Sequence, residues 1–185
     1  MKTLVICSMM CLTALTTEAQ VITRETINSV YESAAANDNG NFVYNAEYQD
    51  DAIATLYVYR KHTDRSGRLT LSPAVMHQYD YDREGRLLSR TTMQWRNGQW
   101  HPDRRLDYQL AIGAYTVTCS HWNNVTATFD QPCDKMTYTM LTDTMVNDIF
   151  SYHRERPTDS FELTSQVVVD TLPFYMDLLL AQNDL

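Results

Sequence analysis

Apolar and polar residues alternate with a period of two along most of residues 41–141. In the first run, Phe42, Tyr44 and Ala46 alternate with less apolar neighbours. Successive side chains of a β-strand point to opposite faces, so this period predicts strands with one buried face. Short turns separate the runs, which favours antiparallel hairpins over a parallel sheet. We therefore predict an all-β fold: an antiparallel meander of consecutive hairpins that forms one twisted sheet, with short helices near the two termini.

The sharpest local signal is the six-residue sequence Trp95-Arg96-Asn97-Gly98-Gln99-Trp100. Asn-Gly is the preferred centre of a two-residue type I′ turn, because both central residues take a positive φ angle. A turn at Asn97-Gly98 brings Trp95 opposite Trp100 on the neighbouring strand. This cross-strand indole pair is expected to stabilise the hairpin by about 0.5–1 kcal/mol.

Two prolines limit the predicted strands, because proline cannot donate a backbone hydrogen bond to a ladder. Pro73 is predicted to end a short strand around residues 69–71, and the alternation resumes at His77. Pro102 predicts a bulge or an edge soon after the tryptophan hairpin.

The N-terminus has the layout of a secretory signal peptide. Lys2 supplies a positive charge, residues 4–15 are mostly apolar, and Thr17-Glu18-Ala19 offers small residues at the cleavage positions. We predict that residues 1–19 are removed, with cleavage before Gln20, and that the mature protein is secreted or periplasmic. The alternative is a buried N-terminal strand. No later run approaches the ~18 apolar residues of a membrane helix, so we predict no membrane insertion.

The rest of the chain divides into three parts by its pattern. A segment with some helical spacing comes first, the alternating region follows, and a tail with a late strand and a short helix after Pro173 comes last. These parts are residues 20–40 as an N-terminal segment or linker, 41–141 as the β domain, and 142–185 as a C-terminal extension.

The charge balance excludes some classes of partner. The chain has 15 Lys and Arg against 23 Asp and Glu, a formal net charge of −8. Nucleic acids and polybasic membrane anchors both need a basic surface, so neither is predicted. A glycan or a cell-surface protein remains as the expected partner, and no motif implies a cofactor.

Cys119 and Cys133 are the two cysteines that would remain after signal-peptide cleavage. Two cysteines in an exported chain favour a disulfide, which would pin the loop between them. One alternative is a pair of buried free thiols. Another is a metal site that includes His121, although scattered ligands without a Cys-x-x-Cys pair are a weak zinc signal.

The run Tyr79-Asp80-Tyr81-Asp82-Arg83-Glu84-Gly85-Arg86-Leu87 resembles one unit of the tyrosine–aspartate (YD) repeat of Rhs-type proteins. Those proteins wind many units into a large shell, and one unit implies no shell. The wider stretch from Phe42 to Met140 resembles a family of small secreted proteins of unknown function from Bacteroides-type gut bacteria. The pieces that carry this resemblance are Phe42–Asn45, the YD unit, Trp95 with Trp100, Arg105–Tyr108, and Tyr115–Val117 leading to Trp122-Asn123.

That family resemblance implies a secreted, β-rich protein with no assigned activity and no accepted catalytic residues. Two tripeptides also resemble O-glycosylation acceptors of those bacteria: Asp143-Thr144-Met145 and Asp170-Thr171-Leu172. They make Thr144 and Thr171 candidate acceptors. The alternative is that both are ordinary threonines of a loop or strand.

Motifs of catalysis are scarce in this sequence. It has no Gly-x-Ser-x-Gly, no His-Glu-x-x-His, no phosphate-binding glycine loop and no Cys-x-x-Cys. His101 and Asp103 could hold a metal, but they flank Pro102 and are more typical of a polar loop. Asp80 and Asp82 could form a carboxylate pair of the glycosidase kind, although acids at this spacing usually form a solvated face.

The aromatic residues carry the functional hypothesis. The chain has 12 Tyr, 5 Phe and 3 Trp, and a single sheet of this size cannot bury both of its faces. Exposed aromatic clusters tend to mark binding surfaces. We predict a non-catalytic binding or structural module with a contact patch of Tyr79, Tyr81, Trp95 and Trp100. The alternatives are that these rings pack the core, or that the protein is a small secreted hydrolase using Asp80 and Asp82.

Overall fold

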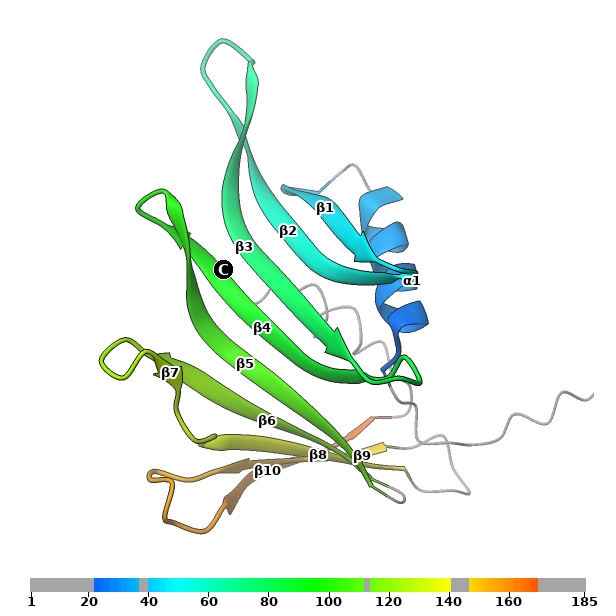
Figure 1. Cartoon of the computed structure of the whole chain (residues 1–185), viewed down its shortest axis with the longest axis vertical. Helices are drawn as coiled ribbons and strands as arrows, with labels where there is room; N and C mark the ends of the chain where they lie inside the picture. The colour runs from blue at the N-terminus through cyan, green and yellow to red at the C-terminus, as the bar shows by residue number, and fades with distance from the viewer. Residues whose placement is uncertain (1–21, 37–39, 112–113, 141–146, 170–185) are drawn as a thin grey trace, which may run out of the picture.

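The computed structural model describes residues 22–36, 40–111, 114–140 and 147–169. This part of the chain forms one helix and ten strands (Figure 1). Their bounds are α1 Arg24–Ala36, β1 Phe42–Gln49, β2 Ala52–Thr63, β3 Leu69–Tyr81, β4 Leu87–Arg96, β5 Gln99–Ala111, β6 Ala114–Asn123, β7 Thr128–Phe129, β8 Asp134–Met140, β9 Asn147–His153 and β10 Glu162–Val169.

All strand pairs are antiparallel and belong to one open sheet. The order across the sheet is β1-β2-β3-β4-β5-β6-β8-β9-β10, with β7 paired to β6 off this path. Each strand therefore lies beside its neighbours in sequence, apart from the small β7 excursion. The predicted meander of consecutive hairpins and the all-β class are confirmed. Because β9 and β10 continue the sheet, residues 147–169 share it with residues 42–140.

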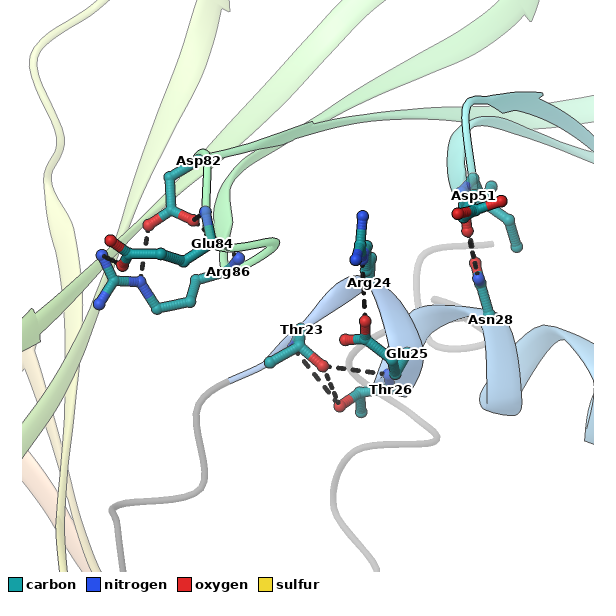
Figure 2. Close-up of polar contacts among 10 residues, drawn as sticks. Thr23, Arg24, Glu25, Thr26, Asn28, Asp51, Asp82, Glu84 and Arg86 are labelled. Atoms are coloured by element: carbon teal, nitrogen blue, oxygen red, sulfur yellow. Dashed lines mark hydrogen bonds and ion pairs between the residues drawn. The ribbon is translucent and has the colours of Figure 1, made fainter.

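Helix α1 begins at a threonine cap and packs against β1 and β2 (Figure 1). The amide of Thr26 donates to Thr23 Oγ1 at 3.4 Å, and the amide of Thr23 donates to Thr26 Oγ1 at 3.4 Å (Figure 2). Such reciprocal bonds satisfy amides that the first turn of a helix leaves open. Asn28 then ties the helix to the β1–β2 turn, because its Nδ2 donates to the carbonyl oxygen of Asp51 at 2.7 Å.

The hydrophobic core lies on the face of the sheet that α1 covers, which we call the helix face. Ile27 and Val30 of α1 pack there with Ile53 and Leu56 of β2, and all four are buried. Burial of these side chains contributes most of the stability of such an arrangement. The buried members of the cluster are Ile22, Ile27, Val30, Ile53, Leu56, Tyr79, Leu87, Tyr108, Tyr115 and Val117.

Two prolines occupy irregular points of the ladders. The prediction that Pro73 ends a strand is wrong, because β3 runs from Leu69 to Tyr81 without interruption. Pro73 stands opposite Tyr59 at a shift of register, where a bulge removes the need for its missing amide hydrogen. The bulge predicted near Pro102 is confirmed by a register shift between Thr92 and Met93.

Two turns of the sheet have almost the same sequence, Asp64-Arg65-Ser66-Gly67-Arg68-Leu69 and Asp82-Arg83-Glu84-Gly85-Arg86-Leu87. The first joins β2 to β3 and the second joins β3 to β4, so they lie at opposite ends of β3. In the second turn, the amide of Arg24 donates to the carbonyl oxygen of Gly85 at 2.9 Å, and Thr23 forms an isolated bridge with Arg86.

Several sequence predictions lie outside the described residues: the signal peptide of residues 1–19, the helix after Pro173, and the candidate acceptors Thr144 and Thr171. In the part of the chain that the structure describes, no helix is long and apolar enough to cross a membrane.

Candidate functional site

The predicted contact patch is divided between the two faces of the sheet. Tyr79 lies on the helix face with only 5% of its surface exposed, and its ring stacks on Tyr81 at 6.5 Å between centroids. Burial raises the pKa of Tyr79 far above its ordinary value. The Tyr81 hydroxyl donates to the carbonyl oxygen of Ile53 at 3.0 Å. The prediction that these two tyrosines form an exposed patch is wrong, because their strand positions face the core.

The tryptophan hairpin is confirmed. Trp95 stands directly opposite Trp100, and the central residues Asn97 and Gly98 have φ angles of 52° and 79°. The indole centroids are 5.0 Å apart with an angle of 67° between the rings, an edge-to-face contact. Trp95 is 38% exposed, so this pair is not part of the buried core.

Two tyrosines of β2 extend the indole pair. The ring of Tyr57 lies 6.1 Å from the ring of Trp100 and 6.5 Å from the ring of Tyr59. Leu56 and Val58 of the same strand are buried in the core, so Tyr57 and Tyr59 point to the opposite face. We call Tyr57, Tyr59, Trp95 and Trp100 the aromatic platform, and the face that carries it the outer face.

The hydroxyl of Tyr57, at the edge of the aromatic platform, has a hydrogen-bond partner. The Tyr57 hydroxyl donates to Glu47 Oε2 at 3.3 Å. Burial raises the pKa of Tyr57, and the nearby Glu47 carboxylate raises it further. The phenol is therefore a hydrogen-bonding group over the whole physiological pH range.

A small polar pocket of about 140 Å³ lies at the tip of the β4–β5 hairpin. Within it, Arg96 and Asp103 form a long ion pair with 3.8 Å between Nη2 and Oδ1. The structure brings His101 and Asp103 into this one pocket, although no group of three or more metal-ligating side chains occurs among the described residues. The lining residues are Arg96, Asn97, His101, Pro102, Asp103, Trp122 and Asn124.

Asp80 and Asp82 serve different structural contacts. Asp80 Oδ2 accepts a hydrogen bond from Ser89 Oγ at 2.6 Å, across the β3–β4 ladder. Asp82 accepts from the amides of Glu84 and Arg86 and forms an ion pair with Arg86 Nε at 2.6 Å (Figure 2). Burial raises the pKa of Asp82, but the hydrogen bonds from Arg86 and Glu84 outweigh it and hold the pKa below its ordinary value.

Asp82 also lines a pocket of about 430 Å³ on the helix side of the β3–β4 turn. Tyr108, Leu110 and Tyr115 line it with apolar surface, and Arg86 lines it together with Asp82. The only carboxylate among the lining residues of this pocket is therefore the one held ionised by the turn.

Cys119 and Cys133 are not bonded to each other in the structure, so the predicted disulfide is corrected to two separate, half-buried cysteines. The register explains this, because Cys119 stands opposite Asp134 on β8. Cys133 comes one residue before Asp134, and neighbouring positions of a strand point to opposite faces. The Cys133 thiol instead lies 3.9 Å from the carbonyl oxygen of Gln131.

Tyr57 and Tyr59 are not included in the contact patch predicted from the sequence, although both belong to the aromatic platform. A signal for them was present, since both alternate with the apolar residues Leu56 and Val58. That alternation assigns the two tyrosines to one face. It does not say which of the two faces the helix covers.

Comparison with known proteins gives a family match. A family model described as "Family of unknown function (DUF3836)" matches residues 1–140. No curated protein matches the chain. These findings confirm the coarser part of the resemblance seen in the sequence, a family of unknown function with structural relatives from Bacteroides species. The resemblance to a YD repeat stays a prediction.

One solved structure shares the fold, and two more are similar over a smaller part of the chain. A protein of unknown function from Bacteroides fragilis is 19% identical with a TM-score of 0.57, and the match covers 76% of this chain and 99% of that one. A DUF3836 family protein from Bacteroides vulgatus is 17% identical with a TM-score of 0.44, over 49% of this chain and 89% of that one. Another from Parabacteroides distasonis is 16% identical with a TM-score of 0.42, over 49% and 85%.

Proposed function

We propose, from the premise that this chain belongs to the DUF3836 family of unknown function, that it is an exported, non-catalytic binding module. Its ligand is a glycan, which packs on the aromatic platform of the outer face. The observation that carries the proposal is the unbroken contact of four aromatic rings away from the core, with centroid separations of 5.0, 6.1 and 6.5 Å.

The chemistry of a sugar ring fits such a surface. A pyranose has apolar C–H faces and polar hydroxyls around its rim, so its faces pack on aromatic rings while its hydroxyls bond to polar groups. The aromatic platform offers the rings in a row across two hairpins. Glu47 beside Tyr57, and Asn97 and Asn124 in the pocket at the hairpin tip, offer acceptors and donors for hydroxyls.

The acidic residues support a binding role over hydrolysis. A glycosidase needs one carboxylic acid whose pKa is raised so that it can donate a proton. Asp82 has a lowered pKa and is held by Arg86, and Asp80 accepts a hydrogen bond from Ser89.

The test is the double variant Trp95→Ala/Trp100→Ala, measured by calorimetric titration against glycans that the native protein selects on a glycan array. We expect binding to fall by about 100-fold or more, because aromatic anchors dominate such interfaces. The far-UV spectrum should stay native, since neither indole belongs to the core. The melting temperature should fall by only a few degrees, because the lost indole pair contributes about 0.5–1 kcal/mol.

Tyr152→Ala is the matched control, because Tyr152 is a half-buried aromatic residue of β9 outside the aromatic platform. Its affinity should stay at the native value. If the double variant unfolds, Tyr57→Ser and Tyr59→Ser are measured in its place. Native affinity in folded variants of the aromatic platform, or turnover of any glycoside by the native protein, would refute the proposal.

A further inference from the structure

We infer that the glycan is anionic, and that basic side chains at the tip of the β2–β3 hairpin bind its carboxylate or sulfate groups. The inference rests on the proposed function and adds a class of ligand to it.

The first observation is a reversal of charge. The chain as a whole has a formal net charge of −8. Residues 60–71, which form the end of the β2–β3 hairpin, carry four basic residues and one aspartate, a local net charge of +3 with histidine neutral. The basic residues are Arg60, Lys61, Arg65 and Arg68. Positive charge that is concentrated at one hairpin of an otherwise acidic protein attracts anions to that hairpin.

The second observation is that the only aspartate of residues 60–71, Asp64, accepts hydrogen bonds from its own turn. Asp64 Oδ1 accepts from the amide of Ser66 at 2.8 Å, from its hydroxyl at 2.6 Å and from the amide of Arg68 at 3.0 Å. The carboxylate is thus bound to the turn itself. Among the described residues, neither the Arg65 nor the Arg68 guanidinium forms an ion pair with a carboxylate.

The third observation is the placement of this charge beside the aromatic platform. Tyr57, Tyr59 and Lys61 are alternate residues of β2, so they follow one another along the outer face. The hairpin continues past the aromatic platform and projects beyond its neighbours (Figure 1). A glycan that packs on the tyrosine rings and extends toward the hairpin tip therefore reaches the basic residues next.

Acidic groups near the aromatic platform are engaged by protein partners. Glu47 accepts from the Tyr57 hydroxyl, and Asp103 lies 3.8 Å from Arg96 and 3.8 Å from Arg104. Asp103 is thus paired with two arginines, and Glu47 is hydrogen-bonded to the Tyr57 hydroxyl.

This combination of rings and guanidinium groups selects among anions. Guanidinium groups bind carboxylates and sulfates through paired hydrogen bonds, while the rings need a ligand with apolar faces. Uronic acid and sulfated sugars provide both in one residue. An extended polyanion such as a nucleic acid duplex or an anionic bilayer would also face the acidic remainder of the chain, so those partners are disfavoured.

The test compares ligands that differ only in charge. Oligogalacturonate and its methyl ester share one backbone, and heparin fragments are paired in the same way with their desulfated, N-acetylated form. We expect the native protein to bind at least one acidic form at least tenfold more tightly than its neutral partner. Raising NaCl from 0.05 to 0.5 M should remove most of that difference.

The chain offers a matched control variant in its two similar turns. Arg65→Glu should weaken binding of the acidic form by about tenfold and leave the neutral form unchanged. Arg83→Glu makes the same change of charge in the same local sequence, at the opposite end of β3, and should leave both affinities at the native value.

The outcomes separate this inference from the proposed function. Equal binding of acidic and neutral forms, both lost in Trp95→Ala/Trp100→Ala, would overturn the anionic ligand and leave the glycan module standing. Equal weakening by Arg65→Glu and Arg83→Glu would overturn the role of the hairpin tip. Binding to vesicles with anionic lipid but to no glycan would overturn both proposals, as would the absence of glycan binding altogether.

Discussion

The Asp64–Leu69 and Asp82–Leu87 turns differ at one position of six, and they fold in the same way into different surroundings. In each turn the aspartate amide donates to the arginine carbonyl, at 3.1 and 2.9 Å, and the glycine amide donates back to the aspartate carbonyl, at 3.0 and 3.1 Å. The glycines have φ angles of 82° and 78°. Yet Leu69 is 56% exposed, whereas Leu87 is 2% exposed.

The difference comes from the segment that lies against the second turn. The amide of Leu87 donates to the carbonyl oxygen of Ile22 at 2.8 Å, and the Arg24 side chain lies beside Gly85. No other atom of the described residues, apart from those of the two chain neighbours, lies within 4 Å of the position that a Cβ would take at Gly67. A short sequence thus determines the local hydrogen bonds, while the tertiary contact decides whether the turn supports the core or projects into solvent.

The largest expected contrast is between the two leucines. Leu87→Ala should lower the free energy of unfolding by about 2–5 kcal/mol, because it opens a cavity in the core. Leu69→Ala should change it by less than about 0.5 kcal/mol, as is usual for an exposed site. Urea denaturation of both variants measures the contrast. Equal destabilisation would mean that the two turns do not differ in burial in solution.

The two glycines should give a smaller contrast. Gly67→Ala and Gly85→Ala each place a Cβ in the left-handed region, which costs about 1–2 kcal/mol. At Gly85 the new Cβ would also lie 3.1 Å from Arg24 Nε, so the arginine must shift. We expect Gly85→Ala to be the more destabilising of the two in thermal unfolding. The reverse order would show that Arg24 does not rest on this turn.

The two aspartates should give the smallest contrast, visible as a dependence on pH. Hydrogen bonds from Ser66 and the Arg68 amide lower the pKa of Asp64, and the bonds from Arg86 and Glu84 lower that of Asp82 against the effect of burial. A lowered folded-state pKa stabilises the protein above the unfolded value of about 3.9. That stabilisation is lost as the pH falls through the lower folded value.

Asp64→Asn and Asp82→Asn should therefore be less stable than the native protein at pH 7. The deficit of each should shrink by pH 3, and more for Asp82→Asn, since only Asp82 pairs with an arginine in its turn. Denaturation midpoints at the two pH values measure this. A deficit that is the same at both pH values would assign the effect of the substitution to shape and not to charge.

Much of the fold was predictable because its determinants are local. The alternation around Tyr44 and Tyr57 predicts strands, and Asn97-Gly98 predicts a turn with a defined register, which the structure confirms. The faces were not predictable. Tyr79 and Tyr57 have the same alternating context, but one faces the core and the other the outer face, because the docking of α1 makes one face the interior.

The cysteine prediction was wrong for a similar reason. A loop between Cys119 and Cys133 suggests that their thiols could meet, but pairing in a sheet depends on the parity of positions. The β6–β8 register pairs Cys119 with Asp134, one residue away from the partner that a disulfide would need. A single step of register separates the two outcomes, and composition carries no information about it.

The sequential order of the strands has a consequence for how the chain folds. Hairpins between neighbouring strands close short loops, so their entropic cost is small and the contact order stays low for a β-rich protein. The bridge between Thr23 and Arg86 is different, because the loop that it closes contains all of β1, β2 and β3. In the described chain, the kinetic cost of folding therefore concentrates in the docking of α1 on a sheet whose hairpins assemble locally.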